Sequence, residues 1–240
     1  MSRLFRIAID GPGASGKSTT AKLLATKLGF GYIDSGAMFR AVTLKCQQQN
    51  IDLKDQEKVK QVAQSARISF PALDQVEMDG KDVSNLIRNS NITRNISHVA
   101  SNMGVRDILA DQQRAMAKGD IPGANSTGFE HNGRVVKGVV MDGRDIGTVI
   151  LPDAELKVFI EADIKIRSKR RYDELKNKGA LGSDTLQDVQ KDLEARDLAD
   201  RTRKVAPLLK AQDAIALDTS HLTIAQQVEK IYDMVYQRLS

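Results

Sequence analysis

The sequence is poor in aromatic residues and cysteine, and it lacks long apolar runs. Aromatic residues make up 4% of the 240 positions and tryptophan is absent, which disfavours a protein that stacks nucleic-acid bases on aromatic rings. The lone Cys46 has no internal disulfide partner, so we expect a reducing, cytoplasmic compartment. No apolar run is long enough to span a bilayer, and the chain enters an expected strand almost at once, which leaves no room for a signal peptide.

Histidine is scarce as well, whereas basic residues are in excess. His98, His131 and His221 are the only three histidines, and they form no recognisable metal or catalytic cluster. The chain has 36 Lys+Arg against 31 Asp+Glu, a net charge of +5. Such an excess fits either nucleic-acid binding or a basic surface with an anionic small-molecule site. The positions of the arginines distinguish between these interpretations.

A glycine-rich segment near the N-terminus predicts a site for a triphosphate. It fits the pattern G-x-x-x-x-G-K-[ST], in which glycines let successive backbone N–H groups converge on phosphate oxygens. We expect Lys17 to reach the outer phosphates and Ser18 to be a Mg²⁺ ligand. The residues expected to bind ATP here are Gly11, Pro12, Gly13, Ala14, Ser15, Gly16, Lys17, Ser18 and Thr19.

The flanks of this segment favour a phosphate loop over a chance glycine-rich turn. Residues 4–9 are a short, β-branched apolar run that is typical of a buried strand. Apolar residues recur at helical spacing from Ala21 to Leu28, and Gly29 is placed to end the helix. Strand, loop and helix follow in the order that a phosphate loop requires.

Alternating strands and helices predict an α/β fold with a parallel sheet flanked by helices. After residue 66, short strands, an Asp79-Gly80 turn and a helix from about 97 to 118 indicate a small inserted α+β module. Residues 119–134 are rich in Gly, Asn and Pro without periodicity. We therefore predict a core over 1–66 and 135–240, an inserted module over 67–118 and a long connecting loop over 119–134.

Polar clusters follow the expected strands, at the edge where α/β sheets bind ligands. Asp142 ends the apolar run 135–141, and beside a phosphate loop such a residue supports Mg²⁺ directly or through water. The pattern Arg196-x-x-x-Asp200-x-x-Arg203 puts three charges on one expected helical face. It fits either a salt-bridge ladder or two arginines placed around an anion, and spacing does not separate the two.

Several segments together resemble the bacterial-type cytidylate kinase family. They are DGPGASGKST, YIDSGAMFRAVT, VEMDGKDVSNLIR, MDGRDIGTVILPDA, RSKRR, RDLADRTRKVAPL and ALDTS, in this order over almost the whole chain. The resemblance implies a P-loop nucleoside monophosphate kinase core, an inserted monophosphate-binding module and an arginine-bearing lid at about residues 163–182. It also implies transfer of the γ-phosphate of MgATP to CMP or dCMP. We expect a monomer without a nucleic-acid or membrane partner.

The same resemblance implies roles for individual residues. Cytosine would face Ser35, Arg106 and Asp145, with Ser97 as a weaker candidate, and Asp200 would orient the ribose end. The residues expected to be catalytic are Lys17, Arg144, Arg196 and Arg203. The substrate-binding set is Ser35, Arg40, Ser97, Arg106, Arg144, Asp145, Arg196, Asp200 and Arg203. The lid residues expected at the ATP phosphates are Arg167, Arg170 and Arg171.

Two positions depart from the family pattern, and two alternative functions stay open. The family usually has Tyr where Phe39 stands and commonly has Pro at the position of Met103. One alternative is a P-loop kinase for another nucleotide or small acceptor, which Asp145, as an acceptor for an exocyclic amine, would argue against. The other is a nucleic-acid-binding or switch protein, which the few aromatics and the gathering of arginines at expected phosphate sites disfavour.

Overall fold

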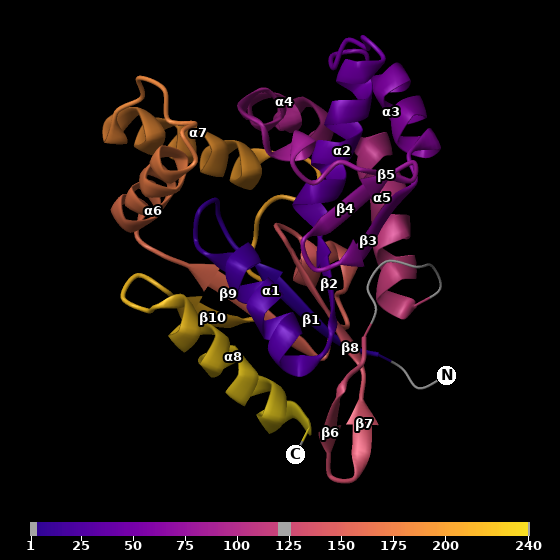
Figure 1. Ribbon diagram of the computed structural model, residues 1–240, viewed down its shortest axis with the longest axis vertical. Helices are drawn as coiled ribbons and strands as arrows, with labels where there is room; N and C mark the ends of the chain where they lie inside the picture. The colour runs from indigo at the N-terminus through magenta and orange to yellow at the C-terminus, as the bar shows by residue number, and fades with distance from the viewer. Residues whose placement is uncertain (1–3, 120–125, 240) are drawn as a thin grey trace. The chain divides into compact units, whose positions relative to one another are not determined.

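The computed structural model describes residues 4–119 and 126–239 (Figure 1). Its largest sheet has five strands in the order β10-β9-β1-β8-β2. The pairs β1–β9 and β9–β10 are parallel, with Ile7 opposite Leu156 and Ile215 opposite Val158. The five strands are β1 (Phe5–Asp10), β2 (Gly31–Asp34), β8 (Gly138–Gly143), β9 (Leu156–Glu161) and β10 (Ile215–Asp218). The predicted α/β fold is confirmed.

Burial explains why these strands are nearly continuous apolar runs in the sequence. Every residue of β1 and β8 is buried, and so are the first five residues of β9. A strand covered on both faces has no solvent side, so the usual alternation of apolar and polar residues disappears. Asp10, which is 4% exposed at the end of β1, is a charged exception with a role in the site described below.

Helices follow the strands in the alternating order that the sequence predicts. The first helix ends at Leu28, and Gly29 follows it with a φ of 62°. Asp34 starts the next helix because its carboxylate accepts the N–H of Ala37 at 2.9 Å. The helices are α1 (Lys17–Leu28), α2 (Ser35–Gln48), α3 (Gln56–Ser65), α4 (Ser90–Ala100), α5 (Met103–Lys118), α6 (Ile164–Asn177), α7 (Leu186–Thr202) and α8 (Ile224–Leu239). Within the described ranges, none of them combines the length and the apolar character needed to cross a membrane.

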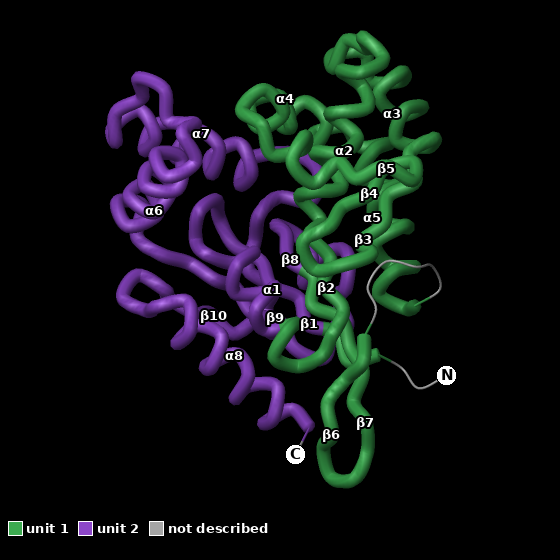
Figure 2. Tube along the Cα trace, in the orientation of Figure 1, with its two compact units in different colours: residues 1–6, 25–141 green, residues 7–24, 142–240 purple. Residues whose placement is uncertain are grey.

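The chain divides into two compact units (Figure 2). Unit 1, drawn in green, comprises residues 1–6 and 25–141, and unit 2, drawn in purple, comprises residues 7–24 and 142–240. The predicted core, inserted module and connecting loop have different boundaries. Their division by function stays a prediction.

Unit 1 contains a small antiparallel sheet, as the sequence predicts for the inserted module. Its strands are β3 (Ile68–Ala72), β4 (Gln75–Met78) and β5 (Lys81–Asp82), in that order. Asp79 and Gly80 have φ angles of 53° and 76°, the left-handed pair that a tight two-residue hairpin requires. The Asp79 carboxylate also accepts the N–H of Arg67 at 3.0 Å, which fixes the hairpin against the chain that precedes it.

The long helix expected from about 97 to 118 is wrong, because the structure has two helices there. The first, α4, ends at Ala100, and α5 starts at Met103. Asn102 interrupts the helical ladder: its side chain accepts the N–H of Val105 at 3.2 Å and donates to the carbonyl of Gln56 at 2.8 Å. An Asn side chain competes with the backbone for hydrogen bonds, which makes it a good N-cap in the middle of an apolar-periodic run.

The region expected to be a connecting loop, residues 119–134, contains a hairpin in its described part. Strands β6 (Phe129–His131) and β7 (Arg134–Val136) pair across Asn132 and Gly133, whose φ angles are 49° and 72°. The Phe129 ring packs against Phe30, with the ring centroids 5.8 Å apart. Asn-Gly is a strong hairpin signal, but strands of three residues are too short to show an alternating pattern. Residues 120–125 lie outside the described residues.

Cys46 lies on the buried face of α2 and is 0% exposed. Burial raises the pKa of its thiol to about 11, because the thiolate would lose its hydration. At neutral pH the sulfur is therefore a protonated, apolar core group.

Candidate active site

The phosphate loop lies in unit 2, between β1 and α1, as the sequence predicts. Gly11 has a φ of 155°, and a Cβ at this position would lie 2.0 Å from the carbonyl oxygen of Ile160. Gly16 has a φ of 90°, and its Cβ would meet the side-chain oxygen of Gln227 at 3.2 Å. At Gly11 a larger residue would force the loop away from the strand end, so both space and conformation require glycine there. At Gly16 the left-handed conformation is the requirement, because the Gln227 side chain could shift to make room.

Lys17 is buried at the start of α1, with 6% of its surface exposed. Its Nζ donates to the carbonyl oxygen of Pro12 at 3.1 Å, so the side chain folds back over the loop. Burial lowers the pKa of Lys17 to about 7, with a further contribution from the Arg144 charge and an opposing one from Asp142. The ammonium is thus held in a site that is short of negative charge.

Binding of ATP should restore the proton to Lys17, because a triphosphate favours the charged ammonium. With a pKa of about 7 in the free protein, ATP affinity should fall by roughly tenfold per pH unit above that value, between about pH 7.5 and pH 9. Titration calorimetry at pH 8 in two buffers of different ionisation enthalpy should reveal net proton uptake. The uptake should vanish in Lys17→Met. Equal heats in both buffers would mean that Lys17 is already protonated in the free protein.

Ser18 and Asp142 bring two oxygen ligands together. The Ser18 Oγ donates to the Asp142 carboxylate at 2.6 Å, and Asp142 is 2% exposed near the end of β8. Mg²⁺ takes oxygen ligands and commonly completes its shell with water and substrate phosphates. These two residues fit such a shared site. Elsewhere in residues 4–119 and 126–239, no group of three or more His, Cys, Asp or Glu side chains offers an all-protein metal cage.

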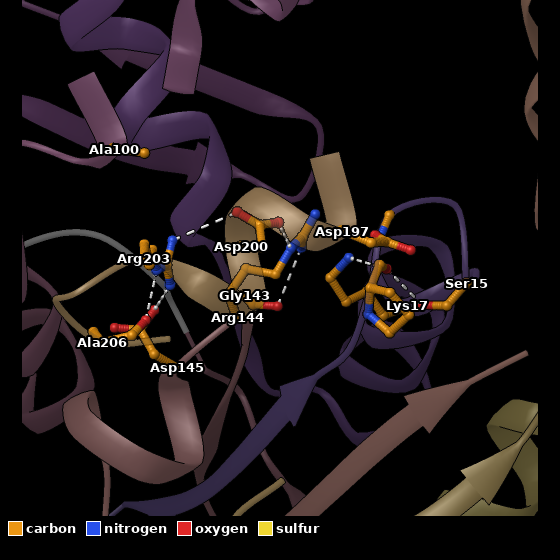
Figure 3. Close-up of polar contacts among 12 residues, drawn as sticks. Ser15, Lys17, Ala100, Gly143, Arg144, Asp145, Asp197, Asp200, Arg203 and Ala206 are labelled. Carbon is orange, nitrogen blue, oxygen red and sulfur yellow. Dashed lines mark hydrogen bonds and ion pairs between the residues drawn. The ribbon is translucent and has the colours of Figure 1, made fainter. Parts of the chain in front are cut away.

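A row of alternating charges runs from Asp145 to Arg144 (Figure 3). Arg203 lies between two carboxylates, with nitrogens 3.6 Å from Asp145 Oδ1 and 3.6 Å from Asp200 Oδ1. The other oxygen of Asp200 accepts the Nε of Arg144 at 2.8 Å. Arg203 is the first residue beyond α7, where its Nε donates to the carbonyl of Ala206 at 2.6 Å. Arg203 is therefore held both by the chain after the helix and by the i,i+3 pair with Asp200 that the spacing suggests.

Asp200 connects the arginines of this row. Burial alone would raise the pKa of its carboxyl, but the Arg144 charge and hydrogen bond, with further contributions from Arg196 and Arg203, hold that pKa below its ordinary value. Both interpretations of the Arg196-Asp200-Arg203 pattern are partly met, because the Arg203–Asp200 ion pair forms and the charges of Arg144, Arg196 and Arg203 all act on the same carboxylate. Such a cluster can exchange its internal contacts for those of an incoming phosphate.

The three arginines expected in the lid differ in their surroundings. Arg167 is buried and donates through Nη1 to the carbonyl of Gly13 at 3.1 Å. Arg170 donates to the carbonyl of Thr219 at 2.6 Å, and the Thr219 hydroxyl in turn donates to the carbonyl of Ser15 at 3.1 Å. Arg171 pairs with Glu174 one turn along α6, at 2.8 Å. The structure brings Arg167, and Arg170 through Thr219, to the phosphate loop, whereas Arg171 pairs within its own helix.

Four expected substrate-binding residues belong to unit 1. Ser35 is buried at the start of α2, and Arg40 donates to the Thr93 hydroxyl at 2.8 Å. Arg106 is 6% exposed, donates to the carbonyl of Ala100 at 3.0 Å, and lies 5.3 Å from the centre of the Phe39 ring. This cation–π contact needs the ring and not a hydroxyl, so Phe39 serves it as Tyr would. The Ser97 side chain is on the exposed face of α4, away from the buried side of that helix.

The position of Met103 explains why methionine is tolerated where the family commonly has proline. It is the first residue of α5 and is 59% exposed. Proline is favoured at this helical position because the N–H there has no intrahelical partner. Methionine loses that preorganisation but breaks no contact of the core.

Sequence reasoning missed Asp10, which shapes the segment that carries Arg144 and Asp145. Its two carboxylate oxygens accept the N–H groups of Ile146 at 2.8 Å and Gly147 at 2.7 Å. Burial raises the pKa of Asp10 to about 6, although both hydrogen bonds oppose this rise. The signal was a charged residue that ends an apolar strand directly before the glycine-rich loop. Without the fold, nothing connects that residue to a segment so far along the chain.

Two more residues that contact the phosphate loop or the first turn of α1 were also missed. Asp197 accepts the N–H of Gly13 at 3.2 Å, and Gln227 accepts the Thr20 hydroxyl at 2.7 Å. Asp197 is one of several acidic residues on a charged helix, and Gln227 is a polar residue in an amphipathic one. Neither has a local pattern that separates it from a solvent-facing residue.

Comparison with known proteins gives this arrangement a family. The family model described as cytidylate kinase matches residues 7–124 and 126–237. A cytidylate kinase from Caldanaerobacter subterraneus subsp. tengcongensis is 44% identical over 230 residues, covering 96% of this chain and 94% of its own. A cytidylate kinase from a Geobacillus species is 42% identical over 242 residues, covering 100% of both. Among solved structures, a shikimate kinase from Bacteroides thetaiotaomicron has a TM-score of 0.47 at 10% identity, covering 96% of this chain and 98% of its own. The chain belongs to the cytidylate kinase family.

Proposed function

We propose that this protein transfers the γ-phosphoryl group of ATP to the phosphate of CMP or dCMP. One observation carries the proposal. The charged groups that act on the buried ammonium of Lys17 are Arg144, Asp142, Arg196 and Asp200. Lys17, Arg144 and Arg196 outnumber the carboxylates of Asp142 and Asp200, so the site is short of negative charge, and a bound polyanion would supply it. The phosphate groups of ATP and of a nucleoside monophosphate are such polyanions.

The reaction gives the cations a defined task. Negative charge spreads over the oxygens of the phosphoryl group during transfer, and cations already in place stabilise it without reorganisation. We assign this role to Lys17, Arg144, Arg196 and Arg203. Arg144 is supported for it because Asp200 and the Gly143 carbonyl, at 2.8 Å and 3.3 Å, orient its guanidinium. The acceptor phosphate is itself anionic, so no side chain has to remove a proton from it.

We propose that Ser18 and Asp142 hold Mg²⁺ together with the phosphates of ATP. Their oxygens are 2.6 Å apart and of the type that this ion prefers. When bound, Mg²⁺ neutralises part of the charge on the β- and γ-phosphates. Arg167 and Arg170, which hold the carbonyls of Gly13 and Thr219, would add cations on the ATP side. Arg171 has a weaker claim because it pairs with Glu174.

On the acceptor side, we propose that Asp145 accepts the C4 amino group of cytosine and that Asp200 orients the ribose. The family resemblance adds Ser35, Arg40 and Arg106 to the proposed substrate-binding set. The contact of Arg106 with Phe39 and Ala100 supports this role, because it holds the guanidinium in one orientation before substrate arrives. Ser97 has the weakest claim, since its side chain is on the exposed face of α4.

A panel of monophosphates tests the proposal. The protein with MgATP should release ADP rapidly when CMP or dCMP is added, and at least about tenfold more slowly, judged by kcat/KM, with UMP, AMP or GMP. A matched preparation of Asp142→Ala should show the same order of substrates at a lower rate. A clear preference for another acceptor would establish the alternative, a P-loop kinase for a different monophosphate.

A further inference from the structure

The Asp197 carboxylate bridges the phosphate loop and the helix that carries Arg167. Its Oδ1 accepts the Gly13 N–H at 3.2 Å, and its Oδ2 accepts Nη1 of Arg167 at 2.5 Å. Asp197 is 7% exposed and Arg167 is 6% exposed. A buried carboxylate that uses one oxygen for each partner fixes the distance between them.

Arg167 is held by more than this ion pair. Its Nε donates to the carbonyl of Ala162 at 2.9 Å, and Nη1 also donates to the carbonyl of Gly13 at 3.1 Å. The guanidinium plane is therefore set by three acceptors. Nη2 has no partner among residues 4–119 and 126–239, so this nitrogen is available for a ligand. A guanidinium fixed in this way presents two N–H groups in one known direction.

Gly13 is held at both of its peptide groups. Its N–H meets Asp197, its carbonyl meets Arg167, and a Cβ at this position would lie 3.3 Å from a methyl group of Leu193 on α7. Glycine loops adopt many backbone conformations when nothing holds them. The conformation of the phosphate loop at Gly13 is therefore set from outside the loop, by α6 and α7. Figure 3 shows Asp197 beside Ser15 and Lys17 of the loop.

We propose that Asp197 is a positioning residue for the ATP side of the reaction: it holds Arg167 and the Gly13 peptide in the geometry that receives the ATP phosphates. The inference rests on the proposed function for the identity of the nucleotide, but not for the geometry. A buried ion pair is a poor source of net stability and a good source of a unique arrangement, which fits a positioning role better than a merely stabilising one.

Two substitutions distinguish the contact of Asp197 with Arg167 from its contact with the Gly13 N–H. Asp197→Asn keeps an oxygen for the Gly13 N–H but places an amide donor against Arg167. Asp197→Ala removes both contacts. We expect Asp197→Asn to raise the KM for ATP and the Kd of an ATP analogue by roughly tenfold, since one charge-assisted hydrogen bond is lost, while the KM for CMP changes less than about twofold. Asp197→Ala should have the larger effect. Asp192→Asn, at an exposed position on the same helix, is the matched control.

A double-mutant cycle gives a measurement that would not change if Asp197 only stabilised the fold. In an Arg167→Ala background, Asp197→Asn should add less than about a further twofold to the Kd of the ATP analogue, because its partner is already gone. A lower melting temperature with unchanged ATP binding, or equal changes in KM for both substrates, would overturn the proposal. Binding of the analogue is measured without an acceptor. If CMP proved not to be the substrate, the proposed function would be wrong, but the binding measurement would still test the role of Asp197.

Discussion

Replacing Lys17 with alanine is expected to lower kcat by about a thousandfold or more, because single charged groups at the transferring phosphoryl are worth this much. The side chain is buried, and its pKa is lowered to about 7 by burial and by the Arg144 charge. Removing it should therefore relieve an unfavourable charge in the free protein. We expect the melting temperature to stay the same or to rise. Steady-state kinetics with MgATP and CMP, together with thermal unfolding, measure both effects.

Lys27→Ala is the control for this substitution. Lys27 lies in the last turn of the same helix and is exposed, so its removal should leave kcat unchanged. Near-normal turnover of Lys17→Ala would remove Lys17 from the catalytic set. A large loss of stability would instead mean that Lys17 is a structural residue, whose bond to the Pro12 carbonyl holds the loop together.

Replacing Asp145 with asparagine should change which pyrimidine the enzyme prefers. An ionised carboxylate can only accept hydrogen bonds, and cytosine offers an amino donor where uracil has a carbonyl. We expect CMP to exceed UMP in kcat/KM by roughly tenfold to a few hundredfold in the wild type, the cost of unpaired buried polar groups. Asparagine can turn its NH₂ group toward the uracil carbonyl. The ratio should therefore narrow, with CMP activity lost and UMP activity held or raised.

The ion pair of Asp145 with Arg203 gives a second way in which Asp145→Asn could change activity. With these groups 3.6 Å apart, Asp145→Asn could act by releasing Arg203, and kcat would then fall by the same factor for CMP and UMP. Arg203→Ala should produce that uniform loss, which makes it the reference for the comparison. An unchanged CMP/UMP ratio in Asp145→Asn would show that Asp145 positions an arginine and does not read the base.

The α/β fold and the phosphate loop could be predicted because their signals are local. The apolar run of β1, the loop glycines and the apolar spacing of α1 lie within one short stretch of chain. The break between α4 and α5 depends on one Asn102 side chain that caps a helix and also contacts Gln56. The β6–β7 hairpin has a local Asn132-Gly133 turn, and its Phe129 packs against Phe30. Both features were missed because a single cap residue and three-residue strands leave no periodic pattern, and their contacts with Gln56 and Phe30 are distant in sequence.

The same distinction applies within the site. Lys17, Ser18 and Asp142 could be chosen because each has a local motif. Asp10 and Asp197 could not, since the backbone N–H groups that they accept lie 136 to 184 positions away in sequence. Their chemistry is a hydrogen bond from a carboxylate to a backbone N–H, and any acidic residue is able to make one. Only the fold decides which acidic residue meets which peptide.

The buried, protonated Cys46 makes the chain convenient for site-specific labelling. Maleimides react with thiolates, and at pH 7.5 a thiol with a pKa of about 11 offers almost none. A new cysteine at an exposed position, such as Met103 at 59% exposure, would therefore be the one reactive sulfur without any need to remove the native one. A fluorophore attached there would report on unit 1 while the core around α2 keeps its natural side chain.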